Sequence, residues 1–269
     1  MDYIKNLKSA SQLLFDRNHQ LFLNFNQHTN QAEYAILYLK NKLNTLAAHL
    51  TAKPAFHYLD VGCGFGNKTL SIIHTIQKYY SVNTVALDPS AKLLSIFKEQ
   101  ITDQPISLIC STWEDYCPTV KFHFISSIHT FYYINNWEQA IKKMIASLEK
   151  KGFLCIAIRS SDVVCKFRDY FYKKIYGEEK KERNSDELCQ LLEQLGIPYT
   201  IDYVDSLLDI RDCLLQNENG EKLIEFLLRQ PYSKLQNIKD DIVMYLKNIH
   251  ENGYLAQKDG YVWISSPFN

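Results

Sequence analysis

A glycine-rich segment after residue 60 contains residue types that can surround a phosphate or a nucleoside. The apolar stretch 56–61 carries Asp60 and runs into Gly62, Gly64 and Gly66, after which a helical pattern begins. Glycine lets the backbone turn sharply and approach a ligand closely, and the helix presents its N-terminus there. A bare GxGxG can be a simple tight turn, but the apolar strand, the acid and the helix together favour a nucleotide-like site.

A second acid lies at a separation typical of nucleoside binding. Asp88 follows Gly66 by 22 residues and ends the apolar run 85–87. A carboxylate at this place can accept hydrogen bonds from both ribose hydroxyls. In the alternative interpretation, Asp88 only shapes the turn while Ser90 caps the next helix. The GxGxG spacing, with an acid two residues before the first glycine, disfavours a nicotinamide cofactor.

Strand-like and helix-like segments alternate through the middle of the chain and would position these residues. Short apolar runs are followed by helical patterns, and such alternation predicts a parallel sheet with helices on both faces. The runs that we expect to be strands are 56–61, 83–87, 106–110, 122–127 and 153–158, and later 199–203 and 260–265. The expected helices cover 67–80, 90–102, 136–149 and 162–176.

Helical patterns also precede and interrupt this alternating core. Two of them occupy 8–25 and 31–50, and a largely helical stretch covers 210–250, between the sixth and the last strand. No internal repeat and no linker separates these pieces. We therefore expect one domain over 1–269, made of a helical cap (1–50), a core (56–206 and 259–269) and a helical insertion (207–258).

The overall composition excludes several classes of protein. Thirty basic residues balance thirty acidic ones and the pI is about 7.1, so no positive field favours nucleic acid as a partner. No apolar window approaches about 18 residues and no signal peptide is visible, so we expect a cytoplasmic protein without a membrane partner. The seven cysteines lack CxxC pairs and Cys/His ligand spacings, which predicts no metal site. The oligomeric state stays open.

Four motifs follow one another within residues 56–160: LDVGCGFG, ALDPS, CSTWEDY and FISSIHTFYYI. Together they resemble the class I S-adenosylmethionine-dependent methyltransferases. The resemblance implies an α/β fold with a Rossmann-like, mostly parallel sheet whose last strand is antiparallel, and S-adenosylmethionine as the cofactor. It also implies that Asp60 and the loop glycines hold the methionine end of the cofactor and that Asp88 holds the ribose.

The same resemblance assigns residues on the adenine side and along the fourth strand. Thr112 and Trp113 belong to the loop after the third strand, which frames the adenine in this family. For Trp113, a place in the core is an equally good interpretation. Ile128 ends the fourth strand and is expected to contact the cofactor.

The segments 22–24, 128–133, 207–213 and 217–220 are similar to one branch of this family, the histamine N-methyltransferases. This similarity implies that His129 and Tyr133 are the catalytic residues, at the end of the fourth strand. It places the substrate, a small-molecule methyl acceptor, among four residues: His28, His129, Tyr133 and Ser265.

The chain departs from that branch at the predicted acceptor site. The branch has a glutamate in the cap, a glutamine at the position of His129 and an asparagine in the last strand. Here the cap segment after Asn24 contains no carboxylate before Glu33. An ammonium group buried without a carboxylate is costly. We therefore predict that histamine is a poor substrate.

These features predict methyl transfer to a small molecule, most simply to an amine nitrogen, in a site closed by the cap and the insertion. An amine attacks only when it is neutral, so His129 either removes its proton or orients it. Two other functions stay open: methylation of a protein side chain that reaches through the caps, and a catalytically silent interaction module. The intact glycine loop and Asp88 argue against the silent module.

Overall fold

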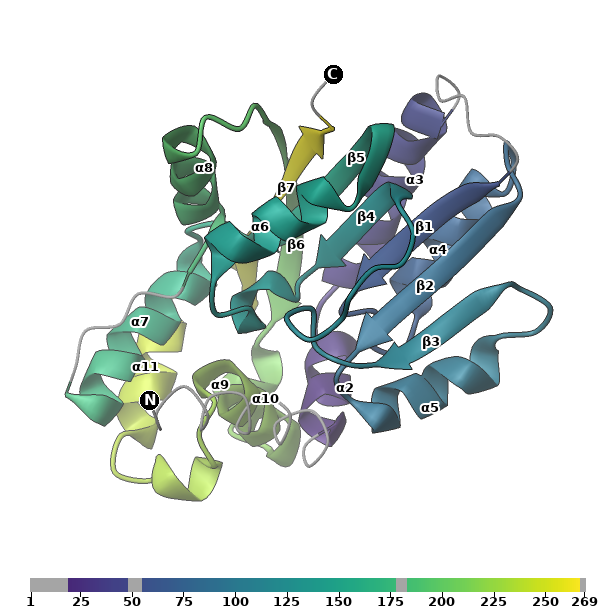
Figure 1. Ribbon diagram of the computed structural model, residues 1–269. Coiled ribbons are helices and arrows are strands. Elements are labelled where there is room, and N and C mark those ends of the chain that lie inside the picture. Colours follow the sequence, from purple (N-terminus) through teal and green to yellow (C-terminus); the bar gives the residue numbers. More distant parts are fainter. Residues whose placement is uncertain (1–18, 48–54, 178–182, 267–269) are drawn as a thin grey trace.

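The computed structural model describes residues 19–47, 55–177 and 183–266 (Figure 1). Its strands are β1 (Phe56–Val61), β2 (Val82–Asp88), β3 (Ile106–Cys110), β4 (Phe122–Ile128), β5 (Leu148–Arg159), β6 (Thr200–Asp209) and β7 (Tyr254–Ser265). In the described residues they form one seven-stranded sheet in the order β3-β2-β1-β4-β5-β7-β6. The pairs among β1 to β5 are parallel, and β7 is antiparallel to both β5 and β6. The predicted Rossmann-like sheet with an antiparallel last strand is confirmed.

The central strands are apolar on both faces because helices cover both. On one face, α3 (Gln31–Ala47) and α4 (Asn67–Ile76) bury Leu39, Leu43 and Ile72 together with residues of β4 and β7. On the other face, α6 (Trp137–Ala146) and α8 (Ser185–Gln194) pack with residues of β5. Helix α5 (Ala91–Gln100) lies along β2 and β3. The sheet therefore forms a rigid middle layer whose carboxyl ends can present side chains precisely.

A second group of helices lies beyond the carboxyl ends of the parallel strands (Figure 1). It contains α2 (His19–Gln27), α7 (Val163–Tyr176), α9 (Arg211–Leu215), α10 (Glu218–Leu228) and α11 (Lys239–Ile249), which share one apolar core. Helix α2 joins α10 through stacked rings of Phe25 and Phe226, with centroids 4.6 Å apart. The cap is thus packed against the insertion, and both cover the same edge of the sheet.

The chain between α2 and α3 is also paired to the outer strand β6. The backbone N–H of Asp209 donates to the carbonyl of His28 at 2.7 Å, and that of Asn30 donates to the carbonyl of Leu207 at 3.3 Å. Thr29 forms an antiparallel bridge with Leu208. These bonds fix where the cap enters the carboxyl edge of the sheet.

Several predicted boundaries shift in the structure. Strands β6 and β7 are longer than predicted, because each continues past the central sheet to pair with the other. They leave helices α9 to α11 as the insertion, between Asp209 and Tyr254. Helix α8 was not predicted from the sequence. Residues 1–18 and 48–50 of the predicted cap (1–50) lie outside the described residues. None of the described helices is long and apolar enough to span a membrane.

Candidate functional site

The glycine loop between β1 and α4 has three glycines in left-handed backbone conformations. The φ angles of Gly62, Gly64 and Gly66 are 82°, 56° and 89°. A Cβ atom on Gly62 would collide with Thr130, and one on Gly66 would collide with the ring of Phe97. A Cβ atom on Gly64 would meet no atom within 4 Å. Gly62 and Gly66 are thus required by packing inside the protein, whereas Gly64 faces open space, as a ligand cradle requires.

Asp60 holds this loop in place through buried hydrogen bonds. Its carboxylate is 3% exposed and accepts hydrogen bonds from the hydroxyls of Thr69 and Ser126, both at 2.6 Å. Burial raises the pKa of Asp60, and the two hydroxyls oppose that shift. The carboxylate therefore ties β1, α4 and β4 together, which holds the loop glycines in place. A direct contact between Asp60 and the cofactor stays a prediction.

Asp88 lies at the end of β2, directly beside the loop. Its Oδ2 atom accepts a hydrogen bond from the backbone N–H of Gly64 at 2.9 Å, and its Oδ1 atom accepts one from that of Ser90 at 2.9 Å. Ser90 also caps α5 through the N–H of Leu93. Asp88 therefore shapes the turn, and it lies where the glycine loop meets the carboxyl end of β2. Its bond to a ribose stays a prediction.

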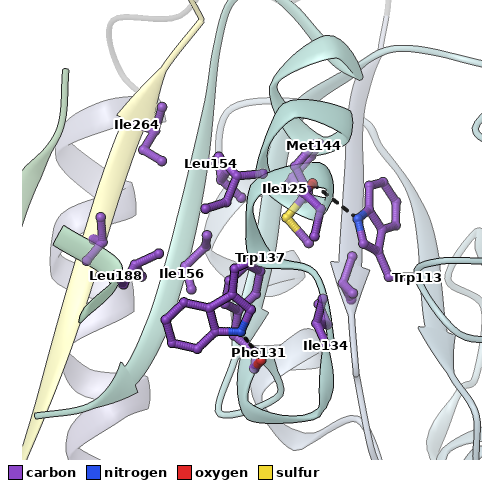
Figure 2. Close-up of a cluster of buried hydrophobic side chains, with 14 of the residues drawn as sticks. Trp113, Ile125, Phe131, Ile134, Trp137, Met144, Leu154, Ile156, Leu188 and Ile264 are labelled. Carbon is purple, nitrogen blue, oxygen red and sulfur yellow. Dashed lines mark hydrogen bonds between the residues drawn. The ribbon is translucent and has the colours of Figure 1, made fainter. Parts of the chain in front are cut away.

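The adenine-side prediction needs a correction. Trp113 is 3% exposed, and its indole N–H donates to the carbonyl of Ala140 at 3.3 Å. Figure 2 shows its ring within the apolar cluster, beside Met144 and Ile125. Trp113 is therefore a core residue that anchors the loop after β3, because its large apolar ring is buried under α6.

The other two predicted residues on this side differ in exposure. Thr112 is partly exposed, and its hydroxyl donates to the Asp115 carboxylate at 2.7 Å, so it stays a candidate for contact with the cofactor. Ile128 is 6% exposed and packs in the apolar cluster under α3 and α4. The side chain of Ile128 therefore supports β4 from the core side.

His129 follows β4 with an unusual backbone conformation. Its φ angle is 59°, a left-handed conformation rare for residues other than glycine, and its N–H donates to the carbonyl of Ala157 at 2.9 Å. The turn directs the imidazole at Asp259 of β7, with Nε2 3.6 Å from Oδ2. This Nε2 atom is buried and has no hydrogen-bond partner among the described residues. Burial, and then the cations Lys68 and Arg159, lower the pKa of His129 well below its usual range, so the ring is neutral near pH 7.

Asp259 is the site residue that the sequence analysis missed. It is 1% exposed and accepts hydrogen bonds from the amide of Gln31, at 2.9 and 3.2 Å to its two oxygens. Burial raises its pKa to about 6, against the opposing effects of Arg159, Gln31 and Lys68. Asp259 directly precedes the predicted strand 260–265, and this acid at the start of an apolar strand was the available signal. Strand β7 thus places a buried carboxylate beside His129, whereas the cap segment after Asn24 has none before Glu33.

The two tyrosines after His129 lie in a 3-10 turn, η1 (Phe131–Tyr133). The hydroxyl of Tyr132 accepts a hydrogen bond from the backbone N–H of Arg159 at 2.6 Å, so Tyr132 braces the end of β5. Tyr133 is partly exposed, and the guanidinium of Arg229 lies 5.9 Å from its ring centroid. Tyr133 therefore lies between η1 and the C-terminal end of α10, on the side covered by the insertion.

Ser265 does not lie beside His129 as predicted, and the contact of His28 with the acceptor stays a prediction. The ring of His28 is held between the cap and the insertion, with Nε2 3.0 Å from the Asp212 carboxylate of α9 and Nδ1 2.7 Å from the carbonyl of Asn24 in α2. Ser265 pairs with Phe153, in the amino-terminal half of β5, so its assignment to the acceptor site is wrong. Because β7 runs antiparallel, its first half reaches the carboxyl edge of the sheet and its end points away.

Comparison with known proteins agrees with this arrangement. A family model described as a methyltransferase domain matches residues 3–199. Histamine N-methyltransferase of Mus musculus is 26% identical over 253 residues, covering 84% of this chain and 83% of that protein. The Danio rerio enzyme is 25% identical over 210 residues, covering 71% and 72%. The solved structure of the plantazolicin methyltransferase BpumL in complex with SAH superposes with a TM-score of 0.56 at 13% identity, covering 99% of this chain and 98% of that one.

The chain belongs to the methyltransferase domain family. With this sheet order and glycine loop, it is a class I S-adenosylmethionine-dependent methyltransferase. The residues present fit the cofactor, because Gly64 leaves open space on the ligand side of the loop and Asp88 lies directly beside it.

Proposed function

We propose that this protein methylates a nitrogen atom of a small molecule. The observation that carries the proposal is the buried imidazole of His129 at the carboxyl end of β4, whose Nε2 atom has no hydrogen-bond partner among the described residues and faces a buried carboxylate. An imidazole nitrogen of this kind can accept a hydrogen bond from the N–H group of an acceptor. The similarity to histamine N-methyltransferases supports the same class of acceptor.

The chain's own residues have three tasks in such a reaction. Gly62, Gly64, Gly66, Asp88 and Thr112 would hold S-adenosylmethionine, which supplies an electrophilic methyl group when bound. The cap and the insertion exclude water from the reacting atoms. His129 orients the acceptor nitrogen by accepting a hydrogen bond from it, which aligns the nitrogen lone pair for displacement.

Aromatic side chains of the cap and the insertion cover the glycine loop. The ring of Phe22 in α2 meets that of Phe65 in the loop edge-on, with centroids 5.8 Å apart, and Phe22 also lies 6.2 Å from Phe226 in α10. Cap, loop and insertion are therefore joined by ring contacts directly above the cofactor side. This arrangement favours a small substrate over a folded protein substrate.

A transfer assay with methyl-labelled S-adenosylmethionine tests the proposal. The panel contains aliphatic amines, among them histamine, benzylamine and 2-phenylethylamine, together with matched phenols and short peptides. We expect label on the nitrogen of at least one amine, located by mass spectrometry, and none with a Gly64→Val variant. Preferential labelling of a phenol oxygen or of a peptide would contradict the proposal and favour another acceptor class.

A further inference from the structure

The buried carboxylate of Asp259 lacks the partners that such a group needs. Asp259 is 1% exposed, and in the part of the chain that the structure describes its only side-chain hydrogen-bond donor is the neutral amide of Gln31. Among the described residues, the only basic group within 4 Å is the neutral ring of His129. A buried carboxylate without a bound cation is costly, so the site is electrostatically incomplete as the chain alone forms it.

Charged and titratable groups face Asp259 from every neighbouring element. Lys68 of α4 and Arg159 of β5 favour its ionised form from beyond ion-pair distance, while Tyr261 lies on the same face of β7. Arg159 is shared with Asp162, its Nη1 atom being 4.0 Å from the carboxylate. Gln31 begins α3, so the cap contributes one wall of this site. Among the described residues neither cation forms an ion pair with Asp259, whose one basic neighbour within 4 Å is His129, so we assign the ligand to the imidazole side.

We propose that Asp259 binds the cationic nitrogen of the acceptor and takes the proton that this nitrogen must lose. The inference rests on the proposed function and names its substrate class: a primary or secondary amine that arrives as an ammonium ion. An N–H bond of the ammonium breaks and its proton goes to a carboxylate oxygen of Asp259. The nitrogen lone pair then forms the bond to the methyl carbon, and the sulfur–carbon bond breaks with its electron pair remaining on sulfur.

This role has a definite pH dependence. Because the pKa of Asp259 is raised to about 6, the carboxylate is ionised at neutral pH and becomes protonated as the pH falls through that value. A protonated Asp259 can neither attract an ammonium ion nor take its proton. Benzylamine stays fully protonated across this range, so a change in its KM reports on the enzyme rather than on the amine.

The test compares Asp259→Asn with Asp205→Asn, using benzylamine and 2-phenylethylamine as probes. Asp205 is an exposed carboxylate on the neighbouring strand β6, so its substitution controls for the change of charge. We expect Asp259→Asn to lower kcat/KM for the amines at pH 7 by roughly 30-fold or more, as for a truncated buried charge pair. The loss should shrink at about pH 10, where much of the amine is already neutral. Asp205→Asn should match the wild type.

Affinity for S-adenosylhomocysteine, measured by calorimetry, shows whether Asp259→Asn remains folded. If that variant does not fold, the wild-type KM for benzylamine between about pH 5 and pH 8 replaces it and should rise as the pH falls below about 6. Three results would overturn the inference and leave the proposed function standing. Folded Asp259→Asn could methylate the amines within twofold of wild type, or its loss of activity could be equal at every pH. The third result is a wild-type KM for benzylamine that does not change with pH. If the wild type methylates no amine, the proposed function fails and this inference fails with it.

Discussion

The carboxyl edge of the sheet has a cofactor side and an acceptor side, and the buried carboxylates on these two sides differ in their hydrogen-bond partners. On the cofactor side, Asp60 accepts from two hydroxyls and Asp88 accepts from two backbone N–H groups. On the acceptor side, Asp259 has one amide donor and faces an imidazole nitrogen that has no hydrogen-bond partner in the described part of the chain. Carboxylates of the first kind hold the backbone in shape, whereas a carboxylate of the second kind is completed by a ligand.

The two sides also differ in how far apart their residues lie in the sequence. Apart from Thr112, the cofactor side comes from the contiguous segment 60–90, in which one loop and the end of the next strand meet. The acceptor side joins Gln31 of the cap, His129 directly after β4 and Asp259 of β7. A change on the cofactor side should therefore weaken cofactor binding and lower methyl transfer together, while a change on the acceptor side should lower methyl transfer without affecting cofactor binding.

The largest expected effect is that of Gly64→Val on the cofactor side. The β-branched side chain would fill the open space in front of the loop at a φ of 56°, so binding of S-adenosylhomocysteine should become undetectable by calorimetry. Gly196→Val is the matched control, because Gly196 has a φ of 66° and equally open surroundings far along the chain, after α8. If Gly196→Val loses as much cofactor binding as Gly64→Val, the loss in both variants comes from backbone strain alone.

Asp88→Ala should have a smaller effect on the same side. It leaves the N–H groups of Gly64 and Ser90 without their carboxylate and removes the predicted ribose contact. We expect cofactor binding to weaken by about 1–3 kcal/mol, the usual cost of losing a charged hydrogen bond. Unchanged affinity in calorimetry would show that the ribose is held by another group.

The smallest effect is expected for Trp113→Phe, which tests the corrected role of this residue. The change removes the hydrogen bond to the carbonyl of Ala140 and part of a buried ring. It should lower the free energy of unfolding by about 1 kcal/mol and leave cofactor affinity unchanged. Chemical denaturation and calorimetry on the same preparation measure both quantities. A loss of affinity without a loss of stability would return Trp113 to the adenine site.

The contrast between the two sides explains which parts could be predicted from sequence. The loop glycines, Asp60 and Asp88 lie close together in the chain, so strand and helix patterns alone bring them to one place. The position of Asp259 depends on the antiparallel register of β7 and on the docking of the cap, and neither is local in sequence. The same register misplaced Ser265, because only the first half of an antiparallel strand reaches this edge. Trp113 was ambiguous because an aromatic residue after a strand suits a core and a ligand site equally.

The most direct test of the separation between the two sides is one pair of measurements on His129→Ala. Cofactor affinity is measured by calorimetry with S-adenosylhomocysteine, and methyl transfer is measured with the best amine of the panel. We predict affinity within a few-fold of wild type together with a severe loss of transfer, because His129 contacts Asp259 and lies outside the glycine loop. Tyr133→Phe should behave in the same way with a smaller loss. A parallel fall of affinity, transfer and melting temperature in His129→Ala would contradict the account, since it would make His129 a structural residue.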